Sequence, residues 1–243
     1  MPEAVSGAPR YALYTVPPPK SALARFAAAW LGWDIERGGS IDPPERVGLP
    51  VDLHSAVTAE PRRYGFHGTL KAPFRLAAGA SETQLIDAVA DVAAGCGRFA
   101  PIPLRLAALG RFLALIPAES APALSALATM AVERLDRFRA PLSHSELARR
   151  RQAPLTATQE ALLQRWGYPY VMEAFRYHMT LTGSLDPALR ERIAEVLAPA
   201  VAPLVAAPLA IDDVALCVEP TPRARFRVLR RFALGGSAAR GLI

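Results

Sequence analysis

Two of the four histidines in this 243-residue chain begin the same pattern, His-x-Thr-Leu. The first copy lies in YGFHGTLKAPF, residues 64–74, and the second in FRYHMTLTGSL, residues 175–185. At the Thr and Leu frequencies of this chain, chance would give such a pair in roughly one sequence in several thousand. The repeat, from His67 to His178, indicates an internal duplication, so the chain is expected to fold as two related halves.

Each copy predicts a β-strand with one polar face. Side chains alternate between the two faces of a strand, so residues two apart point the same way. The residues expected on the polar faces are His67, Thr69 and Lys71 in the first strand and Arg176, His178, Thr180 and Thr182 in the second. Such a face is too polar to bury without a ligand or water, so it indicates a binding or catalytic surface.

The same order of elements follows each copy. Ser81 with Gln84 forms a capping box that begins a helix, and two strands around Gly110 follow within residues 100–117. After the second copy, Asp186 and Pro187 begin a helix, and PLAIDDVALCVEP and RFRVLRRFAL read as two strands. We therefore predict a single bilobal domain over residues 1–243, with internal repeats around 64–117 and 175–234.

Other stretches predict a strand over residues 11–16 and a helix from Ser21 to Gly32 with an apolar stripe. Residues 33–63 lack periodicity and are interpreted mostly as loop. Further helix starts are predicted at Ser120, Ser143 and Thr156. Strands and helices that mix in this way favour the α+β class.

The charge of the chain permits an anionic partner without demanding one. The net charge is +6, and Lys20 and Lys71 are the only lysines among its 28 basic residues. The sequence shows neither a zinc-finger spacing nor a basic-aromatic repeat of the RNA-binding kind, so a small phosphorylated molecule suits this charge as well as a nucleic acid does. The sequence has no long apolar run and no signal-peptide layout, and the isolated Cys96 and Cys217 are expected to be core residues. A cytoplasmic protein that does not bind membranes is expected, with a monomer as the default and its oligomeric state open.

The paired pattern resembles the two-histidine (2H) phosphoesterase superfamily of LigT and cyclic-phosphodiesterase-like proteins, in which two H-x-[TS] motifs face each other across a cleft. The chain resembles one branch of this superfamily over nearly its full length. The resemblance is clearest in RRYGFHGTLKAPF, GYPYVMEAFRYHMTLTG and YALYTVPPPKSALARFAAAWLG. Members of that branch are commonly encoded beside phosphonate-utilisation genes. The resemblance implies a fold without metal or organic cofactor, in which two antiparallel sheets flank a cleft and helices lie outside. It makes His67 and His178 the catalytic pair and brings Thr69 and Thr180 to the substrate.

The chemistry of these residue types supports the same reaction. Opening a cyclic phosphodiester needs a base that deprotonates water and an acid that protonates the departing alkoxide. Two imidazoles suit these tasks because their pKa near 6.5 lets one be neutral and the other protonated. The hydroxyls of Thr69 and Thr180 can donate to the non-bridging phosphate oxygens. The near-twofold pattern does not say which histidine is the base.

Three cations are expected to add substrate contacts: Lys71, Arg176 and Arg225. For each, an ion pair or a solvated strand face is the alternative. The run Arg149–Arg151 is interpreted as complementing a helix dipole rather than binding an anion. Packing is favoured over base stacking for Tyr168 and Tyr170. His54 and His144 are expected to be non-catalytic, and no metal-ligand spacing is visible.

We therefore predict a hydrolase that acts on a small cyclic phosphodiester, either a nucleoside 2′,3′-cyclic phosphate or a phosphoribosyl cyclic phosphate, in the setting of phosphonate metabolism. The alternative is a protein that binds a nucleotide or an RNA end without turnover. The presence of both histidines favours the enzyme, because a binding protein needs no acid–base pair.

Overall fold

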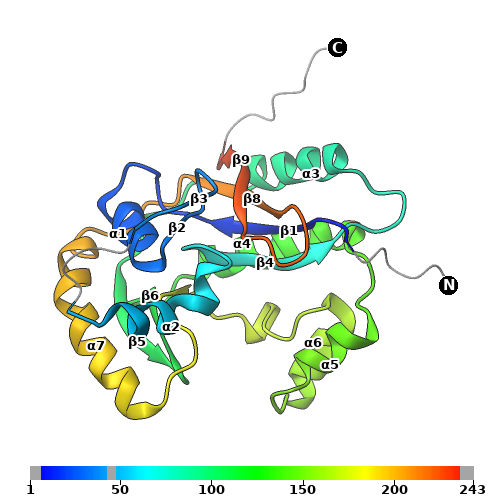
Figure 1. Cartoon of the computed structure of the whole chain (residues 1–243). Coiled ribbons are helices and arrows are strands. Elements are labelled where there is room, and N and C mark those ends of the chain that lie inside the picture. Colours follow the sequence, from blue (N-terminus) through cyan, green and yellow to red (C-terminus); the bar gives the residue numbers. More distant parts are fainter. Residues whose placement is uncertain (1–6, 43–47, 236–243) are drawn as a thin grey trace.

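The computed structural model describes residues 7–42 and 48–235, and one large sheet runs through it (Figure 1). The sheet is antiparallel with strand order β5-β6-β7-β4-β1-β8-β9. Its strands are β1 (Arg10–Thr15), β4 (Gly68–Arg75), β5 (Leu104–Leu109), β6 (Phe112–Pro117), β7 (Met179–Thr180), β8 (Asp213–Glu219) and β9 (Arg227–Ala233). A small second sheet pairs β2 (Trp33–Asp34) with β3 (Gly39–Ser40).

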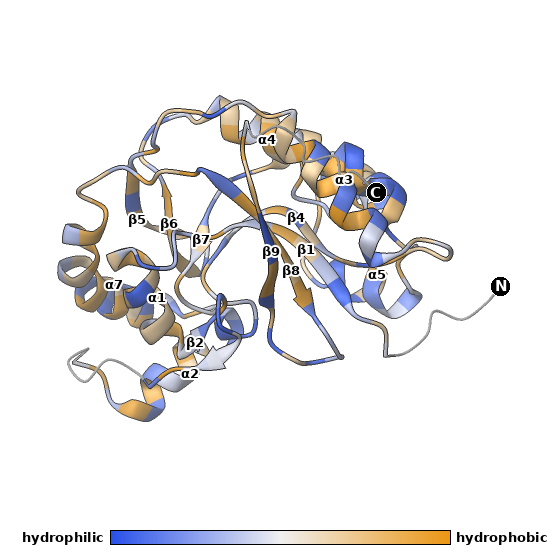
Figure 2. Cartoon of the chain, turned by 90° about the horizontal axis from the view of Figure 1, so that it is seen from above, coloured by the Kyte–Doolittle hydropathy of each residue, from blue (hydrophilic) through white to orange (hydrophobic). Residues whose placement is uncertain are grey.

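The helices gather mainly over one face of this sheet. They are α1 (Ala22–Leu31), α2 (Val51–Arg62), α3 (Glu82–Ala94), α4 (Pro122–Leu135), α5 (His144–Arg150), α6 (Ala157–Trp166) and α7 (Pro187–Val201). Residues of α1, α3, α4 and α7 share one large apolar core with the strands, and α3 lies beside α4 (Figure 2). In β1, Leu13 belongs to this core whereas Tyr14 belongs to a smaller cluster on the opposite face. The predicted α+β class is confirmed.

Most helices begin where the sequence predicts. Ser21 accepts a hydrogen bond from the backbone N–H of Ala24, and Gly32 ends α1 in the left-handed region at φ 68°. The capping boxes at Ser81, Ser143 and Thr156 all form, as does the Asp186 cap. One start is displaced: α4 begins at Pro122 rather than at Ser120, because Pro suits the first turn of a helix.

The expectation of a loop over residues 33–63 is wrong. This segment holds the β2–β3 hairpin and α2. The residue before α2 is Pro50, which makes no side-chain cap, and Pro61 lies inside the helix. Because of these two prolines, the rules for capping and helix-breaking residues do not predict this helix.

The two segments predicted to be repeats are joined through the middle of one sheet rather than forming two separate sheets. After β4 the chain makes α3, β5 and β6, and after β7 it makes α7, β8 and β9. The first hairpin pairs with β7, whereas the second reaches β4 through β1. The β5–β6 hairpin therefore lies beyond β7, and the β8–β9 hairpin lies beyond β4 and β1.

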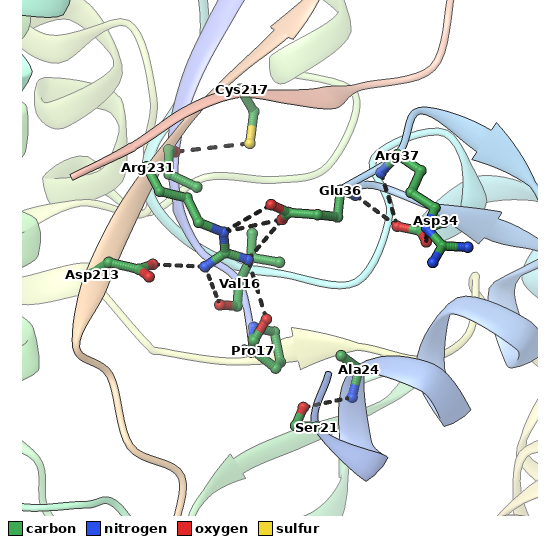
Figure 3. A network of polar contacts seen from close by, with 11 residues as sticks. Val16, Pro17, Ser21, Ala24, Asp34, Glu36, Arg37, Asp213, Cys217 and Arg231 are labelled. Carbon is green, nitrogen blue, oxygen red and sulfur yellow. Dashed lines mark hydrogen bonds and ion pairs between the residues drawn. The ribbon is translucent and has the colours of Figure 1, made fainter. Parts of the chain in front are cut away.

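Arg231 of β9 ties the small hairpin to the sheet (Figure 3). Its guanidinium donates to the carboxylates of Glu36 and Asp213 at 2.8 and 2.7 Å, and to the carbonyls of Val16 and Pro17 at 3.2 Å. The pKa of Asp213 is nevertheless raised, chiefly by burial. Because its contacts lie within the protein, Arg231 serves the fold.

None of the helices in the described part of the chain has the length and apolar character needed to cross a membrane.

Candidate active site

The β4–β7 pairing brings the two histidine motifs together at the centre of the sheet. Gly68 pairs with Met179 in antiparallel register. One residue along in this register, His67 lies across from Thr180, and Thr69 lies across from His178. All four side chains line one cavity of ≈ 480 Å³. The structure thus places each histidine beside the threonine of the other motif.

Gly68 allows this close approach. A Cβ atom at this position would lie 2.4 Å from the ring of Tyr177, which is buried beneath the strands. The Tyr177 hydroxyl is 2.6 Å from Oγ1 of buried Thr15 in β1. A larger residue after His67 would clash with the Tyr177 ring, which would have to move.

Both histidines make the same local hydrogen bond. Nδ1 of His67 lies 2.9 Å from the carbonyl of Gly65, and Nδ1 of His178 lies 2.7 Å from the carbonyl of Arg176. A carbonyl can only accept, so Nδ1 carries the hydrogen in each ring. Nε2 is therefore the nitrogen left for chemistry in both, and Nε2 of His67 lies 3.1 Å from Oγ1 of Thr69.

The surroundings of the two rings differ. His67 stacks on Tyr14, with ring centroids 3.7 Å apart. Burial lowers the pKa of His67 to about 4, and the charge of His178 acts in the same direction, against the hydrogen bond to Gly65. His178 contacts Phe112 loosely, at a centroid distance of 5.5 Å. His67 is thus neutral at neutral pH.

A second, more apolar hollow of ≈ 760 Å³ adjoins the histidine cavity. The two share the walls formed by Thr69, Phe112, Tyr168 and His178. Tyr170 also lines the apolar hollow and is 44% exposed. The two tyrosines contact each other edge to face at 5.6 Å. A ligand at the histidines therefore has an aromatic-walled space beside it.

Lys71 does not share the face of His67. In β4, one extra residue relative to β1 lies between Thr69, which pairs with Tyr14, and Lys71, which pairs with Leu13. This register shift turns Lys71 toward the helices. Its Nζ donates to the carbonyl of Val132 and to Asp136 at 3.2 and 3.3 Å, and burial lowers its pKa to about 8. The expected strand alternation fails at this point.

The other two expected cations lie in different places. Arg176 is exposed and lines the apolar hollow beside His178. Arg225 donates to Ser40 at 3.1 Å and stacks over Trp33, outside the residues that line the histidine cavity. Arg176 is thus near the candidate site, whereas Arg225 packs against the small hairpin.

Sequence reasoning assigned no role to Tyr14, Arg10 and Arg63, which line the cavity. It interpreted Arg149 and Arg150 as complementing a helix dipole, whereas both line the cavity. The hydroxyl of Tyr14 is buried and has no hydrogen-bond partner within the described ranges 7–42 and 48–235. The sequence signal that could have indicated these arginines is the run Arg149–Arg151. Its first two residues line the cavity, and Arg151 binds Glu160.

The remaining histidines lie outside the cavity. His54 is buried in α2 with its ring edge against Trp30 at 4.8 Å, and burial lowers its pKa. His144 is exposed at the start of α5. Among the described residues, no three His, Cys, Asp or Glu side chains gather where they could hold a metal ion.

Comparison with known proteins identifies relatives of this chain. Residues 69–227 match the model of a family described as "Protein of unknown function (DUF1045)". A protein of Janthinobacterium sp. (strain Marseille) is 41% identical over 241 residues, which cover 95% of this chain and 52% of that protein. One of Laribacter hongkongensis (strain HLHK9) is 38% identical over 227 residues, which cover 91% and 51%. Both are named "Ribose 1,5-bisphosphate phosphokinase PhnN".

The chain therefore spans about half the length of these curated relatives. A crystal structure of a conserved protein of unknown function from Agrobacterium tumefaciens str. C58 aligns with 94% of this chain and 87% of that one, at a TM-score of 0.42 and 12% identity.

Proposed function

Since this chain belongs to the family described as protein of unknown function (DUF1045), we propose its activity from its own site: it hydrolyses a small cyclic phosphodiester. The observation that carries the proposal is the placement of two histidines and two threonines from paired strands around one cavity. An acid and a base on opposite sides of a phosphorus atom suit an in-line displacement.

His67 acts as the base in this proposal. Its low pKa makes it neutral at neutral pH, with Nδ1–H committed to Gly65 and Nε2 able to accept a proton. Nε2 removes a proton from a water molecule while the water oxygen forms a bond to phosphorus. Thr69, which lies beside Nε2, turns its hydroxyl to a non-bridging phosphate oxygen.

His178 acts as the acid. The bond from phosphorus to one ring oxygen breaks as the new bond forms, and Nε2–H of His178 protonates the departing alkoxide. The product is a phosphate monoester with a free hydroxyl beside it. His67 ends with an extra proton and His178 lacks one, and exchange with water restores both.

The names of the relatives bear on the substrate. Hydrolysis of a phosphoribosyl 1,2-cyclic phosphate at its 2-oxygen yields ribose 1,5-bisphosphate, the compound in the relatives' name. This match favours the phosphoribosyl substrate over a nucleoside 2′,3′-cyclic phosphate, and it fits a role in phosphonate metabolism. Two consecutive activities would then share one polypeptide in the relatives.

A kinase activity of this chain itself has less support. A P-loop places Gly-Lys-[Ser/Thr] around the phosphates, and neither Lys20 nor Lys71 follows a glycine here. On this proposal the kinase belongs to the half of the relatives that this chain does not match.

The test is to incubate the protein with each of the two cyclic phosphodiesters, in the absence of any nucleoside triphosphate. Ring opening is measured by phosphorus NMR. The blank is the double variant His67→Ala/His178→Ala. Monoester formation by the wild type alone supports the proposal. Tight binding of a cyclic or linear nucleotide with no turnover would favour a nucleotide- or RNA-end-binding protein instead.

A further inference from the structure

Four arginines form one side of the histidine cavity, and we name them the arginine wall: Arg10, Arg63, Arg149 and Arg150. They come from β1, the end of α2 and α5. Three of them, Arg10, Arg63 and Arg149, also line an adjoining hollow of ≈ 440 Å³. The wall therefore continues the histidine site away from the phosphorus-binding centre.

Three guanidinium nitrogens of this wall are buried and unpaired within the described part of the chain. They are Nη2 of Arg10, Nε of Arg63 and Nε of Arg150. A buried N–H without an acceptor is strongly unfavourable, so native proteins rarely leave several in one place. The arginine wall therefore holds more N–H donors than the described residues supply with acceptors.

The charges of the wall leave a positive surplus. Glu219 is 1% exposed and accepts from both Arg10 and Arg63, so one carboxylate serves two guanidinium groups. Arg150 lies over the ring of Tyr168 at 4.7 Å, and burial lowers its pKa.

Two further carboxylates lie nearby without cancelling this surplus. Glu146 binds Arg75, and Glu60 lines the cavity near Gly183. The wall is thus suited to an anion that brings its own acceptors.

We propose that the arginine wall binds a second phosphate group of the substrate, a monoester carried on the same molecule as the cyclic phosphodiester. This inference rests on the proposed function and assigns the residues that bind the second phosphate of its substrate. Guanidinium groups bind phosphate through paired N–H donors, which gives direction as well as affinity. The substrate then lies with its cyclic phosphate at the histidines and its terminal phosphate against the wall.

The test compares matched substrates: adenosine 2′,3′-cyclic phosphate and ribosyl 1,2-cyclic phosphate, each with and without a 5-position phosphate. In the wild type, we expect the phosphate to raise kcat/KM by roughly tenfold to a hundredfold. Arg150→Gln and Arg149→Gln should each reduce this ratio several-fold. Arg151→Gln, the next residue along, whose side chain binds Glu160, is the matched control and should keep it.

Binding decides the inference even if no substrate turns over. Calorimetry compares adenosine 3′-phosphate with adenosine 3′,5′-bisphosphate, and inorganic phosphate serves as a third probe. Tighter binding of the bisphosphate, weakened by Arg150→Gln, supports the inference without the proposed reaction. The inference is overturned if the extra phosphate changes both kcat/KM and binding affinity of the wild type by less than about threefold. It is also overturned if neither arginine variant reduces the effect of the extra phosphate. Tight binding of inorganic phosphate with no gain from the second ester would also overturn it, in favour of a free-phosphate site.

Discussion

The two histidine motifs have nearly the same local sequence but different surroundings. In both, Nδ1 is bonded to the carbonyl two residues earlier, and the residue four positions after the histidine, Lys71 or Thr182, is buried. His67, however, is stacked against a buried tyrosine, whereas His178 has a loose aromatic contact beside an apolar hollow. The repeated pattern thus sets the tautomer in both motifs, and the tertiary surroundings lower the pKa of His67.

The largest expected effect comes from removing either ring. His67→Ala and His178→Ala should each lower kcat by roughly two to four decades, the usual contribution of one general acid or base. Steady-state kinetics on the best cyclic substrate measures this loss. His144→Ala, on an exposed helix start, is the control and should match the wild type. A near-normal rate in either site variant would remove the acid–base pair from the mechanism.

A substrate with an activated leaving group should separate the two roles. Such a group departs without protonation. The rate deficit of His178→Ala relative to the wild type should therefore shrink by roughly tenfold or more, whereas the deficit of His67→Ala should change little. The measurement is the ratio of rates for an activated and an ordinary phosphodiester in each variant. Recovery in His67→Ala alone would exchange the two roles.

The pH profile tests the lowered pKa of His67 directly. A base with a pKa of about 4 is protonated only in acid, so the acidic limb of kcat/KM should fall far below pH 6.5. Tyr14→Leu removes the stacked ring and admits water, which should move this limb upward, whereas Tyr14→Phe should leave it in place. An acidic midpoint at or above 6.5 in the wild type would mean that His67 is not the base.

The smallest effect is expected at Lys71. Lys71→Met should change kcat/KM by less than about threefold, because the ammonium lies on the helix side of the sheet. The free energy of unfolding should change by no more than about 1 kcal/mol near neutral pH, because Asp136 keeps its ion pair with Arg139 and the variant avoids burying the ammonium charge.

The pH dependence of unfolding sharpens this test of Lys71. Its folded pKa of about 8 lies below the ordinary 10.5, so wild-type stability should rise with pH between these values, and the variant should lack that rise. Urea unfolding across this pH range measures the difference. A tenfold loss of kcat/KM in Lys71→Met would return Lys71 to the substrate site.

Local signals made much of the fold predictable. A capping side chain and a left-handed glycine define α1 by themselves, and the predicted alternation holds from His67, just before β4, to Thr69. It fails one residue later because the register shift depends on the partner strand β1, which the sequence of β4 does not record. Likewise α2 has no capping side chain at Pro50, so its stability comes from tertiary packing rather than from a local signal.

The candidate site was predictable only in its central part. The histidines and threonines belong to one repeated pattern, whereas the arginine wall joins residues from three elements that are distant along the chain. Arg10 and Arg63 become neighbours through Glu219 of β8, a contact between segments that no spacing rule connects. Composition alone could not distinguish them, because arginine is common throughout this chain.

The strand order of the large sheet determines what happens when the chain is cut in two. A cut at residues 151–155, between α5 and α6, leaves β6 in one fragment and its partner β7 in the other. It likewise separates β8 from β1. Each fragment would expose unpaired strand edges that only the other fragment can cover. The two fragments should therefore behave as a complementation pair, which rebuilds the sheet and the histidine cavity only when both are produced together.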